Sequence, residues 1–201
     1  MSSRLTWIVA AVAGVAGLIA AALWFAPGPA ALQSGVVLPQ PRALGEFALV
    51  ADDGQPFTLQ RLRGHWTLIF PGFTHCPDVC PTTLALLKQV RVRLAGKPDV
   101  QVVFLSVDPQ RDTPQALSTY VHYFDPAFTG VTAAEPELSR VATQLAIAYE
   151  KVPGPSPDSY SMDHSAALVL VNPQAQVAAY LSPPFQLETL AADLRKATGA
   201  S

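Results

Sequence analysis

The two cysteines of the chain, Cys76 and Cys80, lie four positions apart in the segment 73–81 (FTHCPDVCP). Two thiols at this spacing can form a disulfide, hold a soft metal ion, or do both at different times. Each cysteine precedes a proline, and the residue before a proline is disfavoured in the right-handed helical region. We therefore expect a tight loop that turns both sulfurs toward one point, followed by a helix that begins at Pro81. The amides at that helix N-terminus would favour the thiolate forms of the cysteines.

Metal binding by this pair would need a third ligand, because two thiolates are too few for a structural zinc site or an iron–sulfur cluster. Soft thiolates select copper(I), zinc or such clusters, and we expect the third donor to be a histidine. The spacing C-x-x-x-C also differs from the C-x-x-C of thioredoxin-type redox centres. The additional residue widens the loop and eases joint coordination of one ion by both sulfurs.

Four histidines are available, and their surroundings differ. His65 lies in a turn beside a strand start, and His122 lies in the middle of a predicted helix. His75 adjoins Cys76, but neighbours in an extended chain point to opposite faces, so we interpret His75 as a residue that shapes the loop. His164 follows a segment rich in proline and serine and precedes a buried strand. In a thioredoxin-like sheet the connection that enters this strand faces the active-site cysteines, so we predict His164 as the third ligand.

The segments around the cysteine pair alternate between buried strands and helices with an apolar stripe. The predicted strands are 66–70, 100–107, 166–171 and 176–181, and the predicted helices are 82–94, 113–124, 135–148 and 187–197. Two apolar runs, 47–50 and 57–59, flank an Asp-Gly turn and predict a β-hairpin. This order predicts an α/β fold: a thioredoxin-like mixed sheet flanked by helices, with an N-terminal β-hairpin extension. A reactive loop between a strand end and a helix N-terminus is typical of such folds.

The N-terminal run Leu5–Ala26 has no charged residue and is long enough to cross a bilayer as one helix. A cleaved signal peptide is the alternative, but its apolar core is normally only about 7–15 residues long, and prolines follow Ala26 closely. We therefore predict a single transmembrane helix at 5–26 and a flexible tether at 27–43, rich in proline, glycine and alanine. The thioredoxin-like domain is predicted to occupy 44–201.

The charges beside the span predict its orientation. Arg4 precedes the span and no basic residue follows it until Arg42, so the positive-inside rule leaves residues 1–4 in the cytoplasm. We expect a single-pass protein of the inner (cytoplasmic) membrane with its domain on the periplasmic side. A close cysteine pair can persist as a disulfide in such an oxidising compartment. The net charge of −2 and the scattered basic residues argue against a nucleic-acid partner.

Three segments of the chain resemble the Sco/SenC proteins, which are membrane-tethered, copper-binding assembly factors for cytochrome c oxidase. Segment 72–81 (GFTHCPDVCP) is similar to the cysteine signature of that family. Segment 106–114 (SVDPQRDTP) resembles its S-x-D-P-x-R-D-T stretch, and 160–165 (YSMDHS) resembles its Y-x-x-D-H-[ST] element. The similarity extends from about Phe47 to Ala191, with the three motifs in the order expected for the family.

The resemblance implies that Cys76, Cys80 and His164 are copper ligands and that the protein takes up both copper(I) and copper(II). It implies a metallochaperone, rather than a true enzyme, that helps to assemble the dinuclear copper site of cytochrome c oxidase subunit II. That subunit or another copper-accepting protein would be the partner, together with a copper donor chaperone and a thiol reductant.

The alternative function is a thiol-disulfide oxidoreductase in which Cys76 and Cys80 are redox-active and reduce the cysteines of the copper-accepting subunit. His164 favours the chaperone, because a pure oxidoreductase has no need of an imidazole that faces its dithiol. A thiol peroxidase would need a T-x-x-C setting, which this chain does not match. A purely structural disulfide would close so short a loop that its entropic gain would be small.

Other polar residues near the motifs have more than one interpretation. Asp163 either orients the adjacent histidine or serves as a turn or capping acid. Asp78 either contacts a partner or caps the following helix. In the second motif we expect a structural loop and helix cap rather than direct chemistry, formed by Asp108, Arg111 and Asp112.

Overall fold

The computed structural model describes residues 7–8, 12–18, 21, 31–156 and 159–200. It divides the chain into two units, Met1–Ala30 and Ala31–Ser201. The described residues of the first unit are helical, and no helix within the described ranges is long and apolar enough to cross a membrane. The predicted anchor at 5–26 falls largely on residues outside those ranges, so it stays a prediction.

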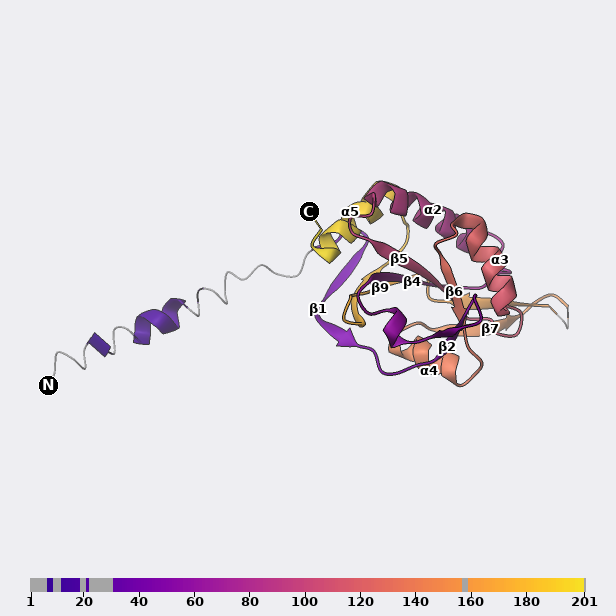
Figure 1. Ribbon diagram of the computed structural model, residues 1–201, viewed down its shortest axis with the longest axis horizontal. Helices are drawn as coiled ribbons and strands as arrows, with labels where there is room; N and C mark the ends of the chain where they lie inside the picture. The colour runs from indigo at the N-terminus through magenta and orange to yellow at the C-terminus, as the bar shows by residue number, and fades with distance from the viewer. Residues whose placement is uncertain (1–6, 9–11, 19–20, 22–30, 157–158, 201) are drawn as a thin grey trace. The chain divides into compact units, whose positions relative to one another are not determined.

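The second unit is built around an eight-stranded mixed sheet with the strand order β1-β10-β9-β4-β5-β6-β2-β3 (Figure 1). The strands are β1 Gly35–Ala43, β2 Leu49–Ala51, β3 Pro56–Phe57, β4 Trp66–Gly72, β5 Val100–Ser106, β6 Thr129–Thr132, β9 Leu168–Val171 and β10 Gln176–Leu181. β4, β5 and β6 run parallel, and the other neighbours pair antiparallel. The predicted mixed sheet and the predicted hairpin, which is β2 with β3, are confirmed.

Helices cover both faces of this sheet (Figure 1). They are α2 Val79–Leu94, α3 Pro114–Phe124, α4 Glu137–Gln144 and α5 Leu187–Thr198, with a 3-10 turn at Leu59–Arg61. Residues of α2, α3 and α5 share one hydrophobic core with the sheet, and residues of α4 and the 3-10 turn share the other. The central parallel strands are therefore buried on both faces, as strands in such layered folds usually are.

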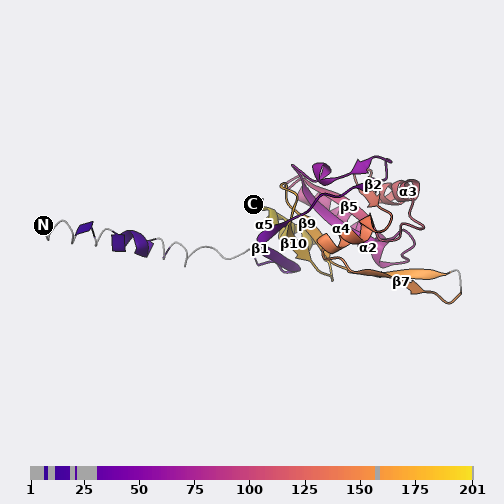
Figure 2. The ribbon, with the colours of Figure 1, turned by 90° about the horizontal axis from the view of Figure 1, so that it is seen from below.

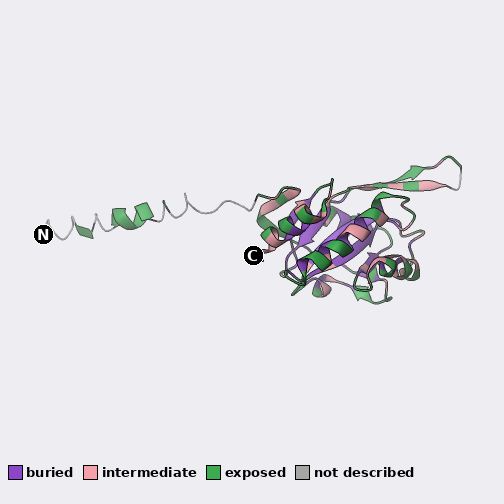
Figure 3. Ribbon diagram, turned by 90° about the horizontal axis from the view of Figure 1, so that it is seen from above, coloured by how far each residue is buried: buried purple, intermediate pink, exposed green. Residues whose placement is uncertain are grey.

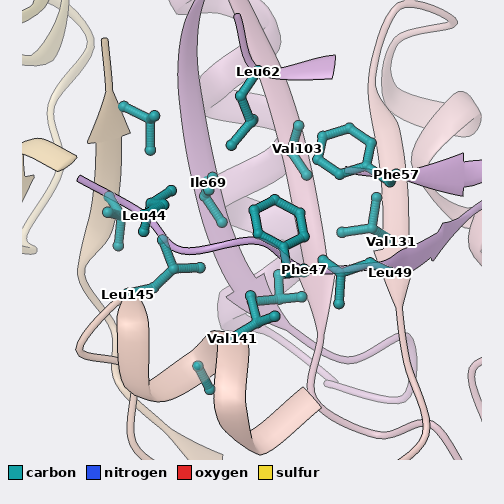
Figure 4. Packing of buried hydrophobic residues seen from close by; sticks show 14 of the residues in the cluster. Leu44, Phe47, Leu49, Phe57, Leu62, Ile69, Val103, Val131, Val141 and Leu145 are labelled. Atoms are coloured by element: carbon teal, nitrogen blue, oxygen red, sulfur yellow. The ribbon is translucent and has the colours of Figure 1, made fainter. Parts of the chain in front are cut away.

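The side chains of β4 alternate between the two cores because successive residues of a strand point to opposite faces. Leu68 and Phe70 belong to the core beneath α2, and Ile69 belongs to the core beneath α4. Figure 4 shows this second core, in which Ile69 and Val103 of the sheet lie near Val141 of α4. Figure 3 shows the buried strands between helices whose outer surfaces are exposed. Burial on both faces holds β4, the strand that leads into the cysteine loop, in place.

Residues 35–43, predicted to be part of a flexible tether, instead form the edge strand β1, paired with β10. The tether prediction is therefore wrong for these residues. The tether was predicted from the content of proline, glycine and alanine. Pro39 and Pro41 are tolerated in β1 because an edge strand needs ladder hydrogen bonds on only one side. The register also shifts between Val37 and Arg42, as it does at a β-bulge.

The chain is also held to the fold just before β1. The backbone N–H groups of Gln33 and Ser34 donate to the carboxylate of Asp193 in α5, over 2.9 and 2.7 Å. Asp193 is almost fully buried, so these bonds to a charged acceptor are shielded from solvent. The folded unit therefore begins more than ten residues before the predicted boundary at Leu44.

β7 Tyr149–Pro153 and β8 Tyr160–His164 form an antiparallel hairpin that is separate from the eight-stranded sheet. Figure 2 shows β7 and its partner strand extending beyond the other elements of their unit. The segment 152–160, which is rich in proline and serine, favours a loop when only its sequence is considered. The hairpin was not predicted because its strands lack the apolar run that marks a buried strand. The strands and the turn between them are rich in proline, serine and charged residues.

Candidate metal centre

The cysteine loop joins β4 to α2. Cys80 is the second residue of α2 and is fully buried, whereas Cys76 lies in the preceding loop and is half-buried; both thiols are free. The helix begins at Val79 rather than at the predicted Pro81, because proline is tolerated in a first turn and burial of Cys80 outweighs the extended preference of a residue before proline. Asp78 occupies the N-cap position, but its side chain makes no capping hydrogen bond.

The two cysteines differ in their electrostatic surroundings. The backbone N–H of Cys80 donates to Sγ of Cys76 over 3.4 Å, so a first-turn amide of α2 contacts the more exposed sulfur. For Cys80 the predicted preference for thiolate is wrong. Burial raises the pKa of its thiol, and a hydrogen bond with the Cys76 side chain adds to the shift. Cys76 is therefore the more accessible sulfur, and burial favours the protonated form of Cys80.

Gly72, the last residue of β4, leaves the space in which the Cys80 sulfur lies. A Cβ atom at this position would lie 2.5 Å from Cε2 of Phe104 and 3.0 Å from Sγ of Cys80. A larger residue would force the ring or the sulfur to move. The buried position of Cys80 therefore depends on glycine at the strand end.

Asp112 fixes the start of the cysteine loop. Its carboxylate is fully buried and accepts hydrogen bonds from the N–H of Thr74 over 2.9 Å, from Oγ1 of Thr74 over 2.6 Å and from Oγ of Ser106 over 2.6 Å. The next residue, Thr113, caps α3 by accepting a hydrogen bond from the N–H of Ala116 over 3.2 Å. The expected structural loop is confirmed, but the helix cap is Thr113 rather than Asp108, Arg111 or Asp112.

The same motif also attaches the hairpin. The phenol of Tyr160 donates to Oδ1 of Asp108 over 2.8 Å, and Nη1 of Arg111 donates to the Tyr160 carbonyl over 3.1 Å. Arg111 forms an ion pair with Asp108 and lies 3.7 Å above the Tyr160 ring and 5.7 Å above the Phe73 ring. Both motifs were identified from the sequence, but the contact between Arg111 and Tyr160 was not predicted. The only signal for it in the sequence is that both motifs occur in the same chain.

His164 is the last residue of β8 and lies against the base of the cysteine loop. Its ring meets the Phe73 ring edge-on, with centroids 6.0 Å apart, and the Phe73 carbonyl accepts a hydrogen bond from the N–H of Cys76. Nδ1 of His164 lies 2.9 Å from the carbonyl oxygen of Ser165. A carbonyl can only accept, so Nδ1 carries the proton and Nε2 keeps the lone pair that a metal needs.

The orienting group of His164 is therefore the Ser165 carbonyl rather than Asp163. Asp163 is exposed and alternates with His164 along the strand, so the two side chains point to opposite faces. The interpretation of Asp163 as the residue that orients the imidazole is not supported by this geometry.

Among the residues that the structure describes, no group of three or more His, Cys, Asp or Glu side chains is placed to hold a metal ion. The structure thus brings His164 to the base of the cysteine loop without assembling it with Cys76 and Cys80 into a three-ligand set. The ligand roles of these three residues stay predictions.

The other histidines have surface contacts. Nδ1 of His75 lies 3.0 Å from Oγ1 of Thr74, and Nε2 of His122 lies 3.2 Å from Oδ2 of Asp52. His65 is exposed in the turn before β4. The contact of His75 agrees with its interpretation as a residue that shapes the loop, and His122 is exposed on α3.

Comparison with known proteins gives a consistent result. A family model described as SCO1/SenC matches residues 37–199. The protein named Protein SCO2 homolog, mitochondrial, from Mus musculus is 36% identical over 155 residues, which cover 76% of this chain and 61% of that protein. The chain therefore matches less than two thirds of the length of this relative.

Two solved structures share the fold. The crystal structure of Arabidopsis thaliana ScoI with copper bound is 34% identical, with a TM-score of 0.72 over 76% of this chain and 96% of that chain. The structure of Bradyrhizobium japonicum ScoI with copper bound is 37% identical, with a TM-score of 0.69 over 77% of this chain and 98% of that chain. The thioredoxin-like α/β architecture, a mixed sheet flanked by helices, is confirmed.

Proposed function

The chain belongs to the SCO1/SenC family, and from that premise we propose that it is a membrane-anchored copper metallochaperone. It binds copper through Cys76, Cys80 and His164 and helps to assemble the dinuclear copper site of cytochrome c oxidase subunit II. The observation that carries the proposal is two free thiols in one loop, with a histidine ring against the base of that loop. Copper in the structures of two relatives that share the fold supports the choice of metal.

The ligand chemistry suits transfer as well as binding. Two thiolates and one imidazole give a three-coordinate site that suits copper(I), since thiolates are soft ligands. The imidazole offers Nε2, because Nδ1 is bonded to the Ser165 carbonyl. A three-coordinate ion leaves an open position at which a ligand of the accepting protein can enter.

Release follows from the separate attachment of His164. The hairpin pairs only with itself, while the thiols belong to the loop that Asp112 holds. When the hairpin moves, His164 can therefore dissociate from the ion before either thiolate does. Copper then passes to the acceptor by stepwise ligand exchange, with one bond broken for each bond formed.

We place the protein in the inner (cytoplasmic) membrane with a single span at 5–26 and its copper domain on the periplasmic side. The uncharged N-terminal run and Arg4 before it support this placement. In that compartment the protein would receive copper from a donor chaperone, and a thiol reductant would keep Cys76 and Cys80 reduced.

Copper stoichiometry tests the proposal. The full chain, purified in detergent with reduced thiols, is loaded anaerobically with copper(I) and assayed for copper and protein. We expect one ion per chain in the wild type, none retained by Cys76→Ser or Cys80→Ser, and reduced retention by His164→Ala. His122→Ala is the matched control, because His122 contacts Asp52 and Ser118 rather than the cysteine loop or the hairpin, and it should bind like the wild type.

Two results would contradict parts of this model. Unchanged copper retention in His164→Ala would remove the three-ligand site and favour an oxidoreductase. Tight copper(I) binding by either Cys→Ser variant would mean that the metal binds elsewhere.

A thiol-disulfide oxidoreductase is the second candidate, supported by the two free thiols and the 3.4 Å contact from the Cys80 amide to the Cys76 sulfur. The Cys76 thiolate would attack one sulfur of the partner disulfide, and the other sulfur would leave as a thiolate. Cys80, after losing its proton, would then displace the second sulfur and leave a Cys76–Cys80 disulfide. Full reduction of an oxidised subunit II fragment by copper-free His164→Ala would favour this function.

A further inference from the structure

A thioether lies on the same face of β8 as His164. Along this strand Tyr160, Met162 and His164 are half-buried, and Ser161 and Asp163 between them are exposed. Successive side chains of a strand point to opposite faces, so the three half-buried residues share one face. Met162 therefore lies between the residue that attaches the hairpin and the predicted copper-binding histidine.

Three contacts attach the hairpin on this face, two of them to the segment after β5 and one to the start of the cysteine loop. Tyr160 donates to Asp108, and the His164 ring packs against Phe73. Lys151, which lies opposite Met162 in the hairpin, reaches Oε1 of Gln110 over 3.0 Å with its Nζ. Met162 lies in the middle of these contacts, so its side chain is on the side of the fold rather than in open solvent.

We propose that Met162 is a further copper(I) ligand and that β8 offers copper a thioether and an imidazole together. This inference rests on the proposed copper function. Residues two apart on a strand are separated by about 7 Å, a span that the long, unbranched methionine side chain can bridge to reach an ion held by His164. Thioether sulfur is a soft ligand that selects copper(I).

The thioether gives the loaded site a second donor from the hairpin. When the hairpin moves away, the copper–imidazole and copper–thioether bonds break, and ligands of the acceptor form two new bonds to the ion. Copper stays copper(I), and both thiolates remain bound at this stage. Met162 and His164 belong to one strand, so they approach and leave the ion together.

Selenium spectroscopy gives a direct test, because the chain has only one other methionine, Met1. The full chain is produced with selenomethionine, loaded with one copper(I) and examined by X-ray absorption at the selenium edge. We expect a copper scatterer in the first shell of selenium in the wild type and none in Met162→Leu. Leucine keeps an apolar side chain of similar size, so the packing of the hairpin is preserved.

A competition titration with a copper(I) chelator supplies the second measurement. We expect Met162→Leu to weaken copper(I) affinity roughly tenfold, at the low end of the effect of losing a supporting group at a metal site. The copper(II) electron paramagnetic resonance spectrum and the unfolding midpoint of the copper-free protein should not change.

The outcomes separate this inference from the proposed function. Wild-type copper(I) affinity in Met162→Leu, with no copper near selenium in the wild type, overturns the thioether ligand and leaves the three-ligand site intact. Lower stability of copper-free Met162→Leu without a copper signal at selenium assigns Met162 to packing alone and also overturns it. A wild-type chain that binds no copper at all refutes the proposed function itself.

Discussion

The cysteine loop and the β7–β8 hairpin carry the two halves of the candidate site, and they are attached to the fold in opposite ways. The loop continues from β4, a central strand buried on both faces, into α2, and the buried Asp112 holds its first residues. The hairpin pairs only with itself and is attached through side chains at its ends, chiefly Tyr160 and His164. One half is part of the core, and the other rests against it.

This difference separates two requirements of a metal carrier. A rigid thiol pair retains the ion because its donors cannot move apart without cost to the core. A hairpin with few contacts can open at a small cost in free energy, because local stability follows the number of buried contacts that must break. Retention would then be a property of the loop, and release a property of the hairpin.

The largest expected effect is on the loop side. Asp112→Ala leaves the N–H and hydroxyl of Thr74 and the hydroxyl of Ser106 without their acceptor. We expect the free energy of unfolding of the copper-free protein to fall by about 3 kcal/mol, since unsatisfied buried donors cost about 1–3 kcal/mol each. Urea denaturation measures it, with the exposed loop residue Asp78→Ala as the control. Equal effects of the two variants would show that the loop is not held by Asp112.

A pair of glycines tests the same contrast with one chemical change. In Gly72→Ala the new methyl group meets the Phe104 ring and the Cys80 sulfur, and overpacking of this kind costs about 1–3 kcal/mol. In Gly154→Ala the methyl group meets the side chain and backbone of Ser159 within the hairpin, and neither residue belongs to a hydrophobic core. We expect urea unfolding to detect a loss only for Gly72→Ala. A comparable loss for Gly154→Ala would mean that the hairpin is as rigid as the core.

On the hairpin side, Tyr160→Phe removes the hydrogen bond to Asp108. We expect a loss of about 1 kcal/mol, the usual net value of one hydrogen bond, and faster hydrogen exchange of the amides of β7 and β8 with no change in β4 or α2. Tyr123→Phe is the control, because Tyr123 is 83% exposed. Faster exchange in β4 would show that the two halves open together, contrary to the comparison.

The last prediction concerns the pH dependence of stability and compares the two halves directly. Burial raises the pKa of the Cys80 thiol, so its contribution to stability is complete below the unfolded thiol pKa of about 8.5 and is lost as the pH rises further. Desolvation, followed by the hydrogen bond to Asp108, raises the pKa of Tyr160. Ionisation of Tyr160 in the unfolded chain therefore also lowers the stability, but only from about pH 10. Unfolding midpoints of the copper-free protein between pH 7 and 10 should therefore fall in the wild type and fall less in Cys80→Ala.

The sequence predicts the loop half of the site well and the hairpin half poorly. β4 and β5 are continuous apolar runs, and Thr113 with Pro114 is a standard helix start, so local patterns suffice for them. β8 buries only parts of alternate residues and β7 buries only part of Tyr149, which leaves no hydrophobic period to detect. The start of α2 was predicted too late because the rule for residues before proline is local, whereas the burial of Cys80 depends on Gly72 and Phe104.

Long-range contacts explain the remaining differences. The stacking of Arg111 on Tyr160 joins residues 49 positions apart, and no local pattern in either motif signals it. The helix predicted at 135–148 is shorter in the structure, and the chain leaves it through Ala146, whose φ of 55° is rare for a residue with a side chain. β1 was missed because its prolines are compatible with a strand only at a sheet edge, and edge position is a property of the whole sheet.

The strand β1 has a practical consequence for solubility. It pairs along β10, whose residues Val177–Leu181 are mostly apolar and buried. A shortened protein that started at Leu44 would expose the backbone N–H and C=O groups of β10 as a new sheet edge. Such an edge can pair with strands of other chains and cause aggregation. A protein that started at Ala31 keeps β1 in place together with the bonds from Gln33 and Ser34 to Asp193, and should stay monodisperse in size-exclusion chromatography where the shorter form precipitates.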